Sequence, residues 1–490
     1  MSCLMEIIII TLVLTAFLYS YFKKTFRYWK ERNVPYEKTK CLFGNLLDML
    51  MEKESLGKYF QKLYEKFDAP YFGIYVFNKP FLVVKDPDVI NYILIKDFTS
   101  FSEKMIYADE IIDPIWSNLL TVMSTAKWRF FRKHLTQTFS SRKLQNMMPL
   151  LKQSSKSIQN YLKDCPKSSA SLNNLIGNYT VDSSTKCFLG IDLDNKAKDA
   201  LRYHIKNYLP SFKKGLYKFY AYMFVQKAVK LLKFKYTNST SSKFIFEICT
   251  NVFKHRENER SERNDLINLL IELKARLQQE NQPKICEIAF VSQAIMFIIA
   301  SQETTTEIIS HTLYELCINK KIQEQLRTEI NEATECSEEL TYKIVQNIKY
   351  LDMVVSETLR QYPVVNFLHR RCIKDYVVPS TGLKIDRGTN IIVPVHGLHF
   401  DSNYYFNPKK YDPERFRYGN INPSMYVPFG IGPRNCIGKR FALLNMKFVI
   451  ADLIQKYKVT LPPNTKNNLS FKTGHIVHAT DEIEIVFEPV

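Results

Sequence analysis

"PFGIGPRNCIGKRF", residues 428–441, is the stretch of sequence that decides the fold. Three of the chain's 14 glycines fall within it, around a single cysteine, Cys436. Glycine permits tight turns that aim backbone N–H groups at one atom, and such groups stabilise the thiolate with which cysteine binds a soft metal. The following residues, "IGKRFALLNMKFVIADLIQKY", predict an amphipathic helix, so Cys436 is expected near a helix N-terminus, where the dipole favours negative charge. Taken alone, the loop also fits a buried structural cysteine in a glycine turn.

The spacing around this cysteine is specific. Phe429, Gly432, Arg434, Cys436 and Gly438 match the pattern F-x-x-G-x-R-x-C-x-G. This loop resembles the haem-binding signature of the cytochrome P450 monooxygenases. The resemblance implies that the cofactor is haem b and that Cys436 is the axial thiolate ligand of its iron. It also implies that Phe429 shields the sulfur and that Arg434 pairs with a haem propionate.

A second motif, "SETLRQYP", places Glu357 and Arg360 three residues apart on one helical face. Such a pair is usually an exposed ion pair that contributes little to stability. The later segment "YDPERF" supplies Arg415. The family resemblance implies that these three residues form one buried carboxylate–diarginine network that braces the cysteine loop.

A third motif, "MFIIASQETTTEIIS", spans Met296–Ser310 and resembles the oxygen-activation stretch of the family's long central helix. An acid followed by a threonine, Glu303 and Thr304, is expected to relay protons. An ordinary amphipathic helix with a surface glutamate is the alternative reading. Family members usually have Ala-Gly where this chain has Ala300-Ser301, and a serine there is expected to bond back to the i−4 carbonyl and bend the helix.

Further arginines resemble those that hold haem propionates in this family. Trp128 and Arg132 in "KWRFFRKHL" lie four residues apart, and Arg370 follows in "HRRCIKDY". Guanidinium–carboxylate pairs are the expected means of holding propionates. His369, beside Arg370, is expected to have a structural role.

The composition excludes other classes of protein. Lys and Arg number 68 against 49 Asp and Glu, a net charge of +19, which indicates an anionic partner such as a membrane surface or an acidic protein. We expect no nucleic acid, because the charge is spread along the chain and no nucleic-acid-binding motif is visible. The 10 cysteines include no C-x-x-C pair, which argues against a disulfide framework and favours a reducing compartment.

The N-terminus predicts a membrane anchor. The apolar run Leu4–Phe22 could span about 28 Å of hydrocarbon as a helix, and basic residues with Tyr28 and Trp29 follow it. A cleaved signal peptide is disfavoured, because the charge follows the apolar run and no small-residue cleavage site appears. We therefore expect a transmembrane signal anchor at 1–22, a basic linker at 23–45 and a single catalytic domain at 46–490. That domain would face the cytosol from the endoplasmic reticulum membrane.

The fold class is expected to be mainly α with small β-sheets (α+β), the cytochrome P450 fold. A hairpin is predicted at Tyr71–Ile90, mostly helix at 91–374, strands at Tyr376–Pro394, and alternation again at Tyr457–Val490. "LFGN" and "LHFDSNYYFNPKKYDPERF" also resemble the animal microsomal group that includes arthropod xenobiotic-metabolising members.

The resemblance implies insertion of one oxygen atom of dioxygen into a lipophilic small molecule, which is xenobiotic, steroid-like or fatty-acid-like. No flavin or NADPH motif is visible, so electrons are expected from a separate NADPH–cytochrome P450 reductase, with cytochrome b5 as a further donor. A reductase-independent haem-thiolate isomerase or dehydratase and a non-catalytic haem-binding protein remain open. Expected pocket positions are 102–124, Phe297, Ala300, 364–368 and 476–478; the basic patch expected to meet the reductase comprises Lys133, Arg142, Lys143, Lys439 and Arg440.

Overall fold

The computed structural model describes residues 2–40, 43–45, 55–164, 169–209, 218–223, 225–259, 263, 265–279, 285–337, 339–463, 465, 469, 471 and 480–490. The chain folds into two compact units, each assembled from separate stretches. Unit 1 comprises Met1–Met105, Val365–Pro408 and Ile421–Asn435. Unit 2 comprises Ile106–Val364, Lys409–Asn420 and Cys436–Val490.

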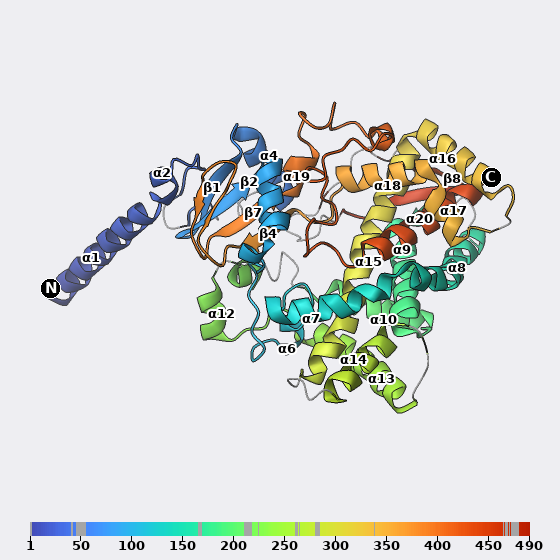
Figure 1. The fold of residues 1–490 in the computed structure, drawn as a ribbon, viewed down its shortest axis with the longest axis horizontal. Helices are drawn as coiled ribbons and strands as arrows, with labels where there is room; N and C mark the ends of the chain where they lie inside the picture. The colour runs from blue at the N-terminus through green and yellow to red at the C-terminus, as the bar shows by residue number, and fades with distance from the viewer. Residues whose placement is uncertain are drawn as a thin grey trace. The chain divides into compact units, whose positions relative to one another are not determined.

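Unit 1 is built on a four-stranded sheet with the order β1-β2-β7-β4. Its strands are β1 (Tyr71–Val76), β2 (Lys79–Val84), β4 (Phe367–Arg371) and β7 (Asn390–Pro394). The predicted hairpin is confirmed, since β1 and β2 pair antiparallel, while β2 and β7 run parallel and β4 and β7 antiparallel. Helices α4 (Leu56–Lys66) and α19 (Val395–His399) pack together beside this sheet (Figure 1). The other elements are α5 (Pro87–Asn91), η1 (Tyr92–Lys96), η2 (Phe98–Ser100) and the pair β5 (Tyr376–Val377) and β6 (Lys384–Ile385).

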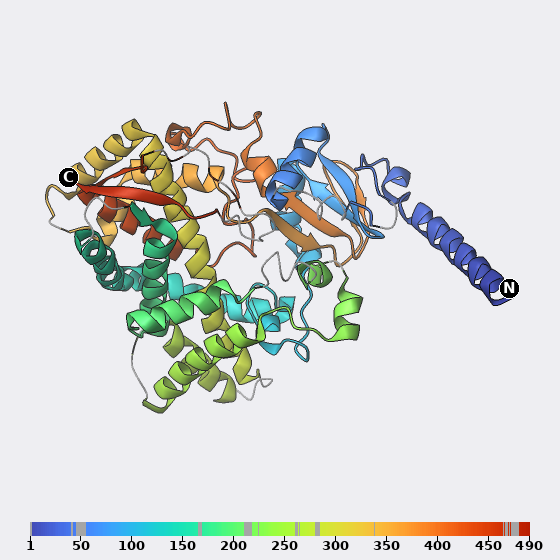
Figure 2. The same ribbon diagram turned by 180° about the vertical axis from the view of Figure 1, so that it is seen from behind.

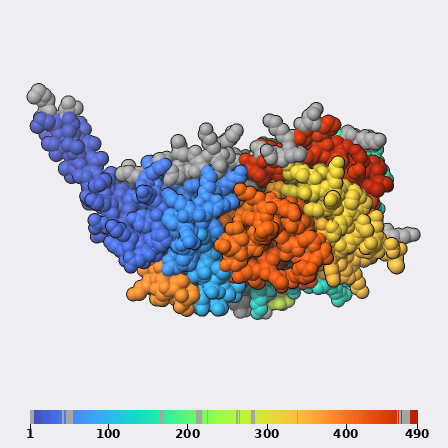
Figure 3. Space-filling view, turned by 90° about the horizontal axis from the view of Figure 1, so that it is seen from above, coloured from blue at the N-terminus to red at the C-terminus, as the bar shows by residue number. Residues whose placement is uncertain are grey.

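Helix α1 (Ser2–Thr25) stands out from unit 1 as a rod whose apolar side chains are exposed (Figure 3). The segment Met5–Glu31 is apolar and long enough to cross a membrane. Directly after α1, the short helix α2 (Tyr28–Glu31) is tied to the sheet by Trp29, which is buried and donates its Nε1–H to the Ile74 carbonyl. Arg32 adds an ion pair to Asp386 at 2.6 Å. The residues after the candidate anchor are therefore packed against the body of unit 1.

Unit 2 is mainly helical and is organised around α15 (Glu287–Ile318), a mostly buried helix against which α9, α13, α18 and α20 pack (Figure 2). A sheet of order β3-β9-β8 lies in the same unit. The helices are α6 (Pro114–Ser117), α7 (Thr125–Leu135), α8 (Ser141–Asp164), α9 (Leu172–Ser184), α10 (Asn195–Lys206), α12 (Gln226–Leu232), α13 (Ser239–Glu259), α14 (Leu266–Gln279), α16 (Lys320–Thr334), α17 (Tyr342–Asn347), α18 (Lys349–Gln361) and α20 (Lys439–Lys456). Shorter elements are η3 (Thr136–Phe139), η4 (Thr185–Leu189), η5 (Pro413–Phe416), β3 (Ser169–Ser171), β8 (Tyr457–Thr460) and β9 (Glu484–Pro489).

One sequence-based expectation about elements is wrong. The helix after Cys436 was expected to be amphipathic, but from Leu444 to Ile454 every residue of α20 is buried, so it is a core helix. Even Lys447 is buried there, and it reaches Asp352 at 3.3 Å. The stretch 91–374 is mostly helical, as predicted, and it also contains the short strands β3 and β4. Strand β4 pairs along its full length with β7.

Candidate functional site

The loop that precedes Cys436 needs glycine at two positions. Gly430 and Gly432 have φ of +66° and +74°, in the left-handed region that glycine tolerates best. A Cβ on Gly432 would lie 1.9 Å from the backbone oxygen of Leu94, so no side chain fits there. Gly438 has an ordinary φ of −85° and caps the N-terminus of α20. The glycines therefore shape the loop and bring it against the backbone after α5.

The sulfur of Cys436 is held by the start of α20, as predicted. The backbone N–H groups of Gly438 and Lys439 hydrogen-bond the sulfur, and they lower the pKa of the thiol together with the charges of Arg132 and Lys439. Burial outweighs them, so the pKa of Cys436 lies above its ordinary value. Cys436 is nevertheless an exposed residue. An exposed cysteine whose sulfur receives donors that favour its anion fits a metal centre lying against it.

Unit 1 holds a cluster of cations that the sequence only partly predicted. Arg370, on β4, is buried, and Arg370 and Arg434 each lower the pKa of Lys104, after the larger effect of burial. In the described part of the chain the buried Arg370 Nε has no hydrogen-bond partner, whereas its Nη1 donates to the His369 carbonyl at 2.8 Å. Collecting like charges in a buried place is costly without an anion, so the cluster fits the carboxylates of a bound group.

His369 and Lys104 complete the account of this cluster. His369 accepts a hydrogen bond at Nδ1 from the Met105 backbone N–H at 3.1 Å, which agrees with the structural role expected for it. Burial, followed by the charges of Lys104, Arg370 and Arg434, lowers its pKa. Sequence reasoning missed Lys104. Its signal was weak, because a single lysine in "SFSEKMIY" looks like any surface charge.

Between Ala289 and Cys317, helix α15 is buried except for one half-exposed stripe. The stripe comprises Met296, Ile299, Ala300, Ser301, Glu303 and Thr304. These positions recur at three- and four-residue spacing, so they lie above one another on one face. The stripe places an acid and a hydroxyl at the end of an apolar patch. This arrangement fits a ligand site that is apolar at one end and has proton-donating groups at the other.

The hydroxyls of this stretch are engaged with the helix backbone. Thr304 Oγ1 donates to the Ala300 carbonyl at 2.7 Å, one residue before the position at which this chain departs from the family's usual sequence. Ser301 Oγ donates to the Ile298 carbonyl at 3.1 Å. The back-bond of Ser301 thus reaches i−3, whereas i−4 was expected. Helix α15 continues unbroken through Ser301 in the described structure.

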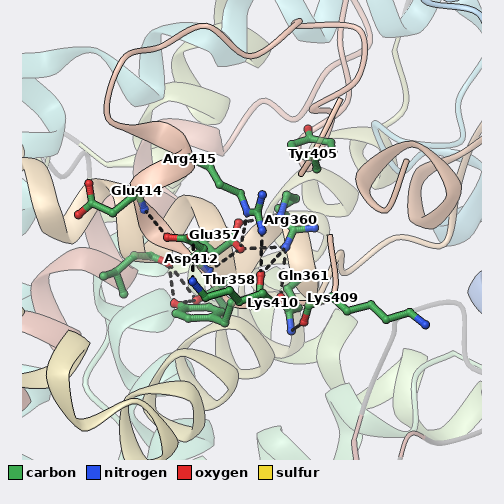
Figure 4. Close-up of polar contacts among 12 residues, drawn as sticks. Glu357, Thr358, Arg360, Gln361, Tyr405, Lys409, Lys410, Asp412, Glu414 and Arg415 are labelled. Atoms are coloured by element: carbon green, nitrogen blue, oxygen red, sulfur yellow. Dashed lines mark hydrogen bonds and ion pairs between the residues drawn. The ribbon is translucent and has the colours of Figure 1, made fainter. Parts of the chain in front are cut away.

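The predicted carboxylate–diarginine network is present. Glu357 and Arg360 have no exposed surface, and two bonds join them: Nε to Oε2 at 2.7 Å and Nη2 to Oε1 at 2.8 Å. Arg415 Nε reaches Glu357 Oε1 at 3.3 Å, and the Asp412 backbone N–H donates to the same oxygen at 2.8 Å (Figure 4). Both arginines also donate to the Lys410 carbonyl. The network therefore fixes the turn at 409–415 to helix α18.

The remaining predicted residues are distributed as follows. Trp128 is buried on α7, and Arg132, one turn later, acts electrostatically on Cys436 in unit 2. Arg370, Arg434 and Phe429 belong to unit 1. The expected pocket positions 476–478 lie outside the described residues.

Comparison with known proteins agrees with this geometry. The cytochrome P450 family model matches residues 34–487, nearly the whole chain. The chain belongs to the cytochrome P450 family. Among its insect relatives, cytochrome P450 6k1 of Blattella germanica is 33% identical over 499 residues, covering 97% of this chain and 94% of the relative. Cytochrome P450 6B2 of Helicoverpa armigera is 33% identical over 472 residues (93% of each chain), and cytochrome P450 6B1 of Papilio polyxenes 32% over 482 (94% of each).

Membership establishes the reaction class and the cofactor. Cytochromes P450 are monooxygenases whose haem iron is ligated by cysteine. This chain offers a cysteine with amide donors aimed at its sulfur, a buried cationic cluster, and a half-exposed stripe with an acid and a hydroxyl. The cysteine and the stripe within unit 2, and the cationic cluster within unit 1, are each of the kind that binds a haem-thiolate group, so the residues present fit the cofactor.

Proposed function

We propose that this cytochrome P450 is a membrane-anchored monooxygenase that oxidises lipophilic small molecules of the xenobiotic, steroid-like or fatty-acid-like kind. The proposal rests above all on Cys436, an exposed residue whose sulfur accepts hydrogen bonds from two backbone amides. The insect relatives, similar over nearly their full length, support the xenobiotic type. The stripe on α15 supports an apolar substrate, because Met296, Ile299 and Ala300 make up half of it.

Each residue of the site has a proposed task. Cys436 ligates the haem iron, Phe429 shields the sulfur, and Gly438 and Lys439 hold its negative charge through their amides. Bound haem with a thiolate ligand activates dioxygen and inserts one of its atoms into the substrate. Arg370, Arg434 and Lys104, with Trp128 and Arg132, hold the propionates through charge-assisted hydrogen bonds. The network of Glu357, Arg360 and Arg415 is structural and supports the cysteine loop.

Glu303 and Thr304 are proposed to deliver the protons with which the second oxygen atom leaves as water. Thr304 keeps its hydroxyl oriented by donating to the Ala300 carbonyl, and its oxygen is then available as an acceptor and as a relay. Glu303, half-exposed on the same stripe, connects that hydroxyl to a proton source. The apolar neighbours on the stripe limit bulk water, which makes a defined relay necessary.

Electrons are proposed to come from NADPH through a separate cytochrome P450 reductase, with cytochrome b5 as a further donor. Unit 2 exposes Lys133 at the end of α7, Arg142 at the start of α8, and Lys439 and Arg440 at the start of α20, while Lys143 is half-buried. Arg440 connects α20 with η3 and α8, because it donates to the Phe139 carbonyl at 2.9 Å and to Ser141 Oγ at 2.6 Å. A basic surface next to the cysteine suits an acidic electron-donor domain.

The anchor is proposed to be α1, which would hold the enzyme in the endoplasmic reticulum membrane with the remaining chain in the cytosol. Its side chains from Met5 to Tyr21 are largely apolar and exposed, as a lipid-facing helix requires. Lys23 and Lys24 follow at the end expected to face the cytosol.

The spectrum of the ferrous carbonyl complex tests the ligand assignment. We expect a thiolate-type Soret band in the full-length protein and its loss in Cys436→His, whereas Cys286→Ser, at an exposed cysteine, should keep it. A thiolate band in Cys436→His would overturn the assignment. Reconstitution with reductase and NADPH then tests the reaction. The product should carry labelled oxygen from dioxygen. Turnover with peroxide in the absence of reductase, without transfer of oxygen to the product, would indicate an isomerase instead.

A further inference from the structure

Helix α15 carries a ladder of titratable side chains that begins at the proposed relay and leads away from it. Glu303, Glu307, His311 and Glu315 recur every four residues. Side chains at this spacing are neighbours on a helix, with Cβ atoms about 5–6 Å apart. Glu307, His311 and Glu315 are buried, with 9%, 1% and 5% of their surface exposed. Burying three acid–base groups in one row of a core helix lowers the stability of the fold, which suggests that they have a function.

Beyond Glu303, the ladder continues with a carboxylate–imidazole pair, Glu307 and His311. Glu307 Oε2 lies 3.8 Å from His311 Nε2. The same oxygen accepts from the backbone N–H of Thr480 at 3.4 Å and from its hydroxyl at 3.5 Å. Glu307 is thus held in place by Thr480, with its carboxylate turned toward His311.

Tyr362 is the next residue along this row, because it contacts both the His311 ring and Glu315. His311 stacks on the Tyr362 ring at a centroid distance of 4.5 Å and an interplanar angle of 17°, and Phe471 lies at 6.2 Å. The Tyr362 hydroxyl donates to Glu315 Oε1. Asn319, half-exposed at the end of α15, donates its Nδ2–H to Glu315 Oε2 at 2.9 Å. The ladder therefore runs from the half-exposed stripe to a half-exposed residue one turn beyond Glu315.

We infer that Glu307 and His311, with Glu315 behind them, form a proton path that reloads Glu303 from the far end of α15. This inference rests on the proposed role of Glu303 and Thr304. For each proton that Glu303 releases into the site, Glu307 gives one to Glu303 and His311 gives one to Glu307. Glu315 then gives one to His311 and takes one from solvent beside Asn319. The path ends each cycle in its starting state, and no electron or heavy atom moves along it. Glu307 and His311 act through Glu303 and are positioning residues.

A static ion pair that only stabilises the helix is the competing explanation. It predicts that removing one partner lowers stability and leaves proton delivery unchanged. A proton path predicts a change in the fate of activated oxygen, because slow protonation lets reduced oxygen escape as hydrogen peroxide. The two explanations therefore separate on coupling and on solvent isotope effects.

The test compares His311→Phe and Glu307→Gln with the unaltered full-length haem enzyme. His311→Phe keeps an aromatic ring beside Tyr362 and Phe471, and Glu307→Gln keeps an acceptor for Thr480. In both variants we expect unchanged NADPH consumption, more peroxide per NADPH and a larger solvent isotope effect on product formation. Product formation should be roughly ten-fold slower. This effect is smaller than the ~10²–10⁴-fold that a directly acting acid–base group contributes. Independently of turnover, the infrared carboxyl band that Glu307→Gln removes should shift in His311→Phe.

Controls make the outcome decisive. Thr312→Val removes a buried hydroxyl on α15 that donates to the Ile308 carbonyl and to Thr358, so it should lower stability and leave coupling and isotope effect unchanged. Thr304→Ala reports the relay itself. If Thr304→Ala uncouples while His311→Phe and Glu307→Gln do not, the inference is overturned and the proposed function stands. If Thr304→Ala and Glu303→Gln leave coupling unchanged, the relay and the path that feeds it both fail. An unshifted carboxyl band would also overturn the path.

Discussion

Glu357 and Arg360 form a two-pronged ion pair, three residues apart on α18, in which neither side chain has any exposed surface. Glu414 and Arg417 are also three residues apart and form an ion pair, but their side chains are 44% and 45% exposed. The two pairs have the same chemistry and sequence separation, so the difference between them is burial.

We therefore predict a large difference between two matched substitutions. Arg360→Ala leaves the Glu357 carboxylate buried with only Arg415 beside it, and it should lower the free energy of unfolding by about 3–5 kcal/mol. Arg417→Ala should produce no measurable change, because exposed pairs contribute little. Chemical unfolding of the haem protein, followed by the Soret band, measures both. Equal losses would mean that the network does not have the structural role proposed for it.

The contrast between these pairs shows what the sequence can and cannot predict. Both pairs have the same local pattern, and only the family resemblance indicated which one is buried. The cysteine loop was more informative, because Gly432 and Cys436 are constrained by their own backbone and by the helix that follows. Lys104 could not be found in this way, because its role depends on pairing between segments that are distant in sequence. The backbone of Glu103, the residue before Lys104, forms an isolated β-bridge with Arg371 on β4, and β4 also carries Arg370. The same applies to His311, whose partners Tyr362 and Phe471 are distant in sequence.

Gly432→Ala should disrupt the cysteine loop. Gly432 and Gly419 have φ of +74° and +66°, but a Cβ on Gly419 meets nothing within 4 Å, whereas one on Gly432 meets the Leu94 oxygen at 1.9 Å. Gly419→Ala should cost only the left-handed strain of about 1–2 kcal/mol. Gly432→Ala should cost more and should lower haem content, because the loop must move away from Leu94. The measurements are thermal unfolding and the haem-to-protein ratio; equal effects of the two changes would contradict the close approach.

Lys104→Met should have opposite effects on the haem-free and haem-bound protein. Burial, and then the charges of Arg370 and Arg434, lower the pKa of Lys104, so the haem-free protein should gain stability when this cation is removed. The haem-bound protein should lose haem about ten-fold faster to a scavenging apoprotein, since one charge-assisted hydrogen bond contributes ~1.5–3 kcal/mol. Lys374→Met, at an exposed lysine of unit 1, is the control and should change neither quantity. Unchanged haem loss in Lys104→Met would remove Lys104 from the propionate site.

Thr304→Ala should raise the amount of hydrogen peroxide released per NADPH, because the half-exposed hydroxyl of the relay is lost. Thr305→Ala is the matched control, since Thr305 is the next residue on α15 and is 1% exposed. It should alter stability and leave coupling unchanged. The readout is peroxide and product formed per NADPH with a saturating reductase. Uncoupling by both changes alike would indicate a general disturbance of α15 instead of a relay at Thr304.

Glu315→Gln should stabilise the protein relative to the unaltered chain by an amount that grows as the pH rises. Burial is the largest cause that raises the pKa of Glu315, and the charge of Glu357 adds to it, while hydrogen bonds from Tyr362 and Asn319 oppose it. A carboxyl whose pKa is higher in the folded than in the unfolded protein binds more protons when folded, so its contribution to stability falls as the pH rises above its ordinary pKa of 4.5. Glutamine does not titrate and still accepts from Tyr362. The difference in unfolding free energy between variant and unaltered protein should therefore grow from about pH 4.5 upward and level off above the raised pKa, as urea unfolding at a series of pH values would measure. A difference that is constant with pH would show that Glu315 is ionised in the folded protein as readily as in the unfolded one, and that burial next to Glu357 does not hold its proton.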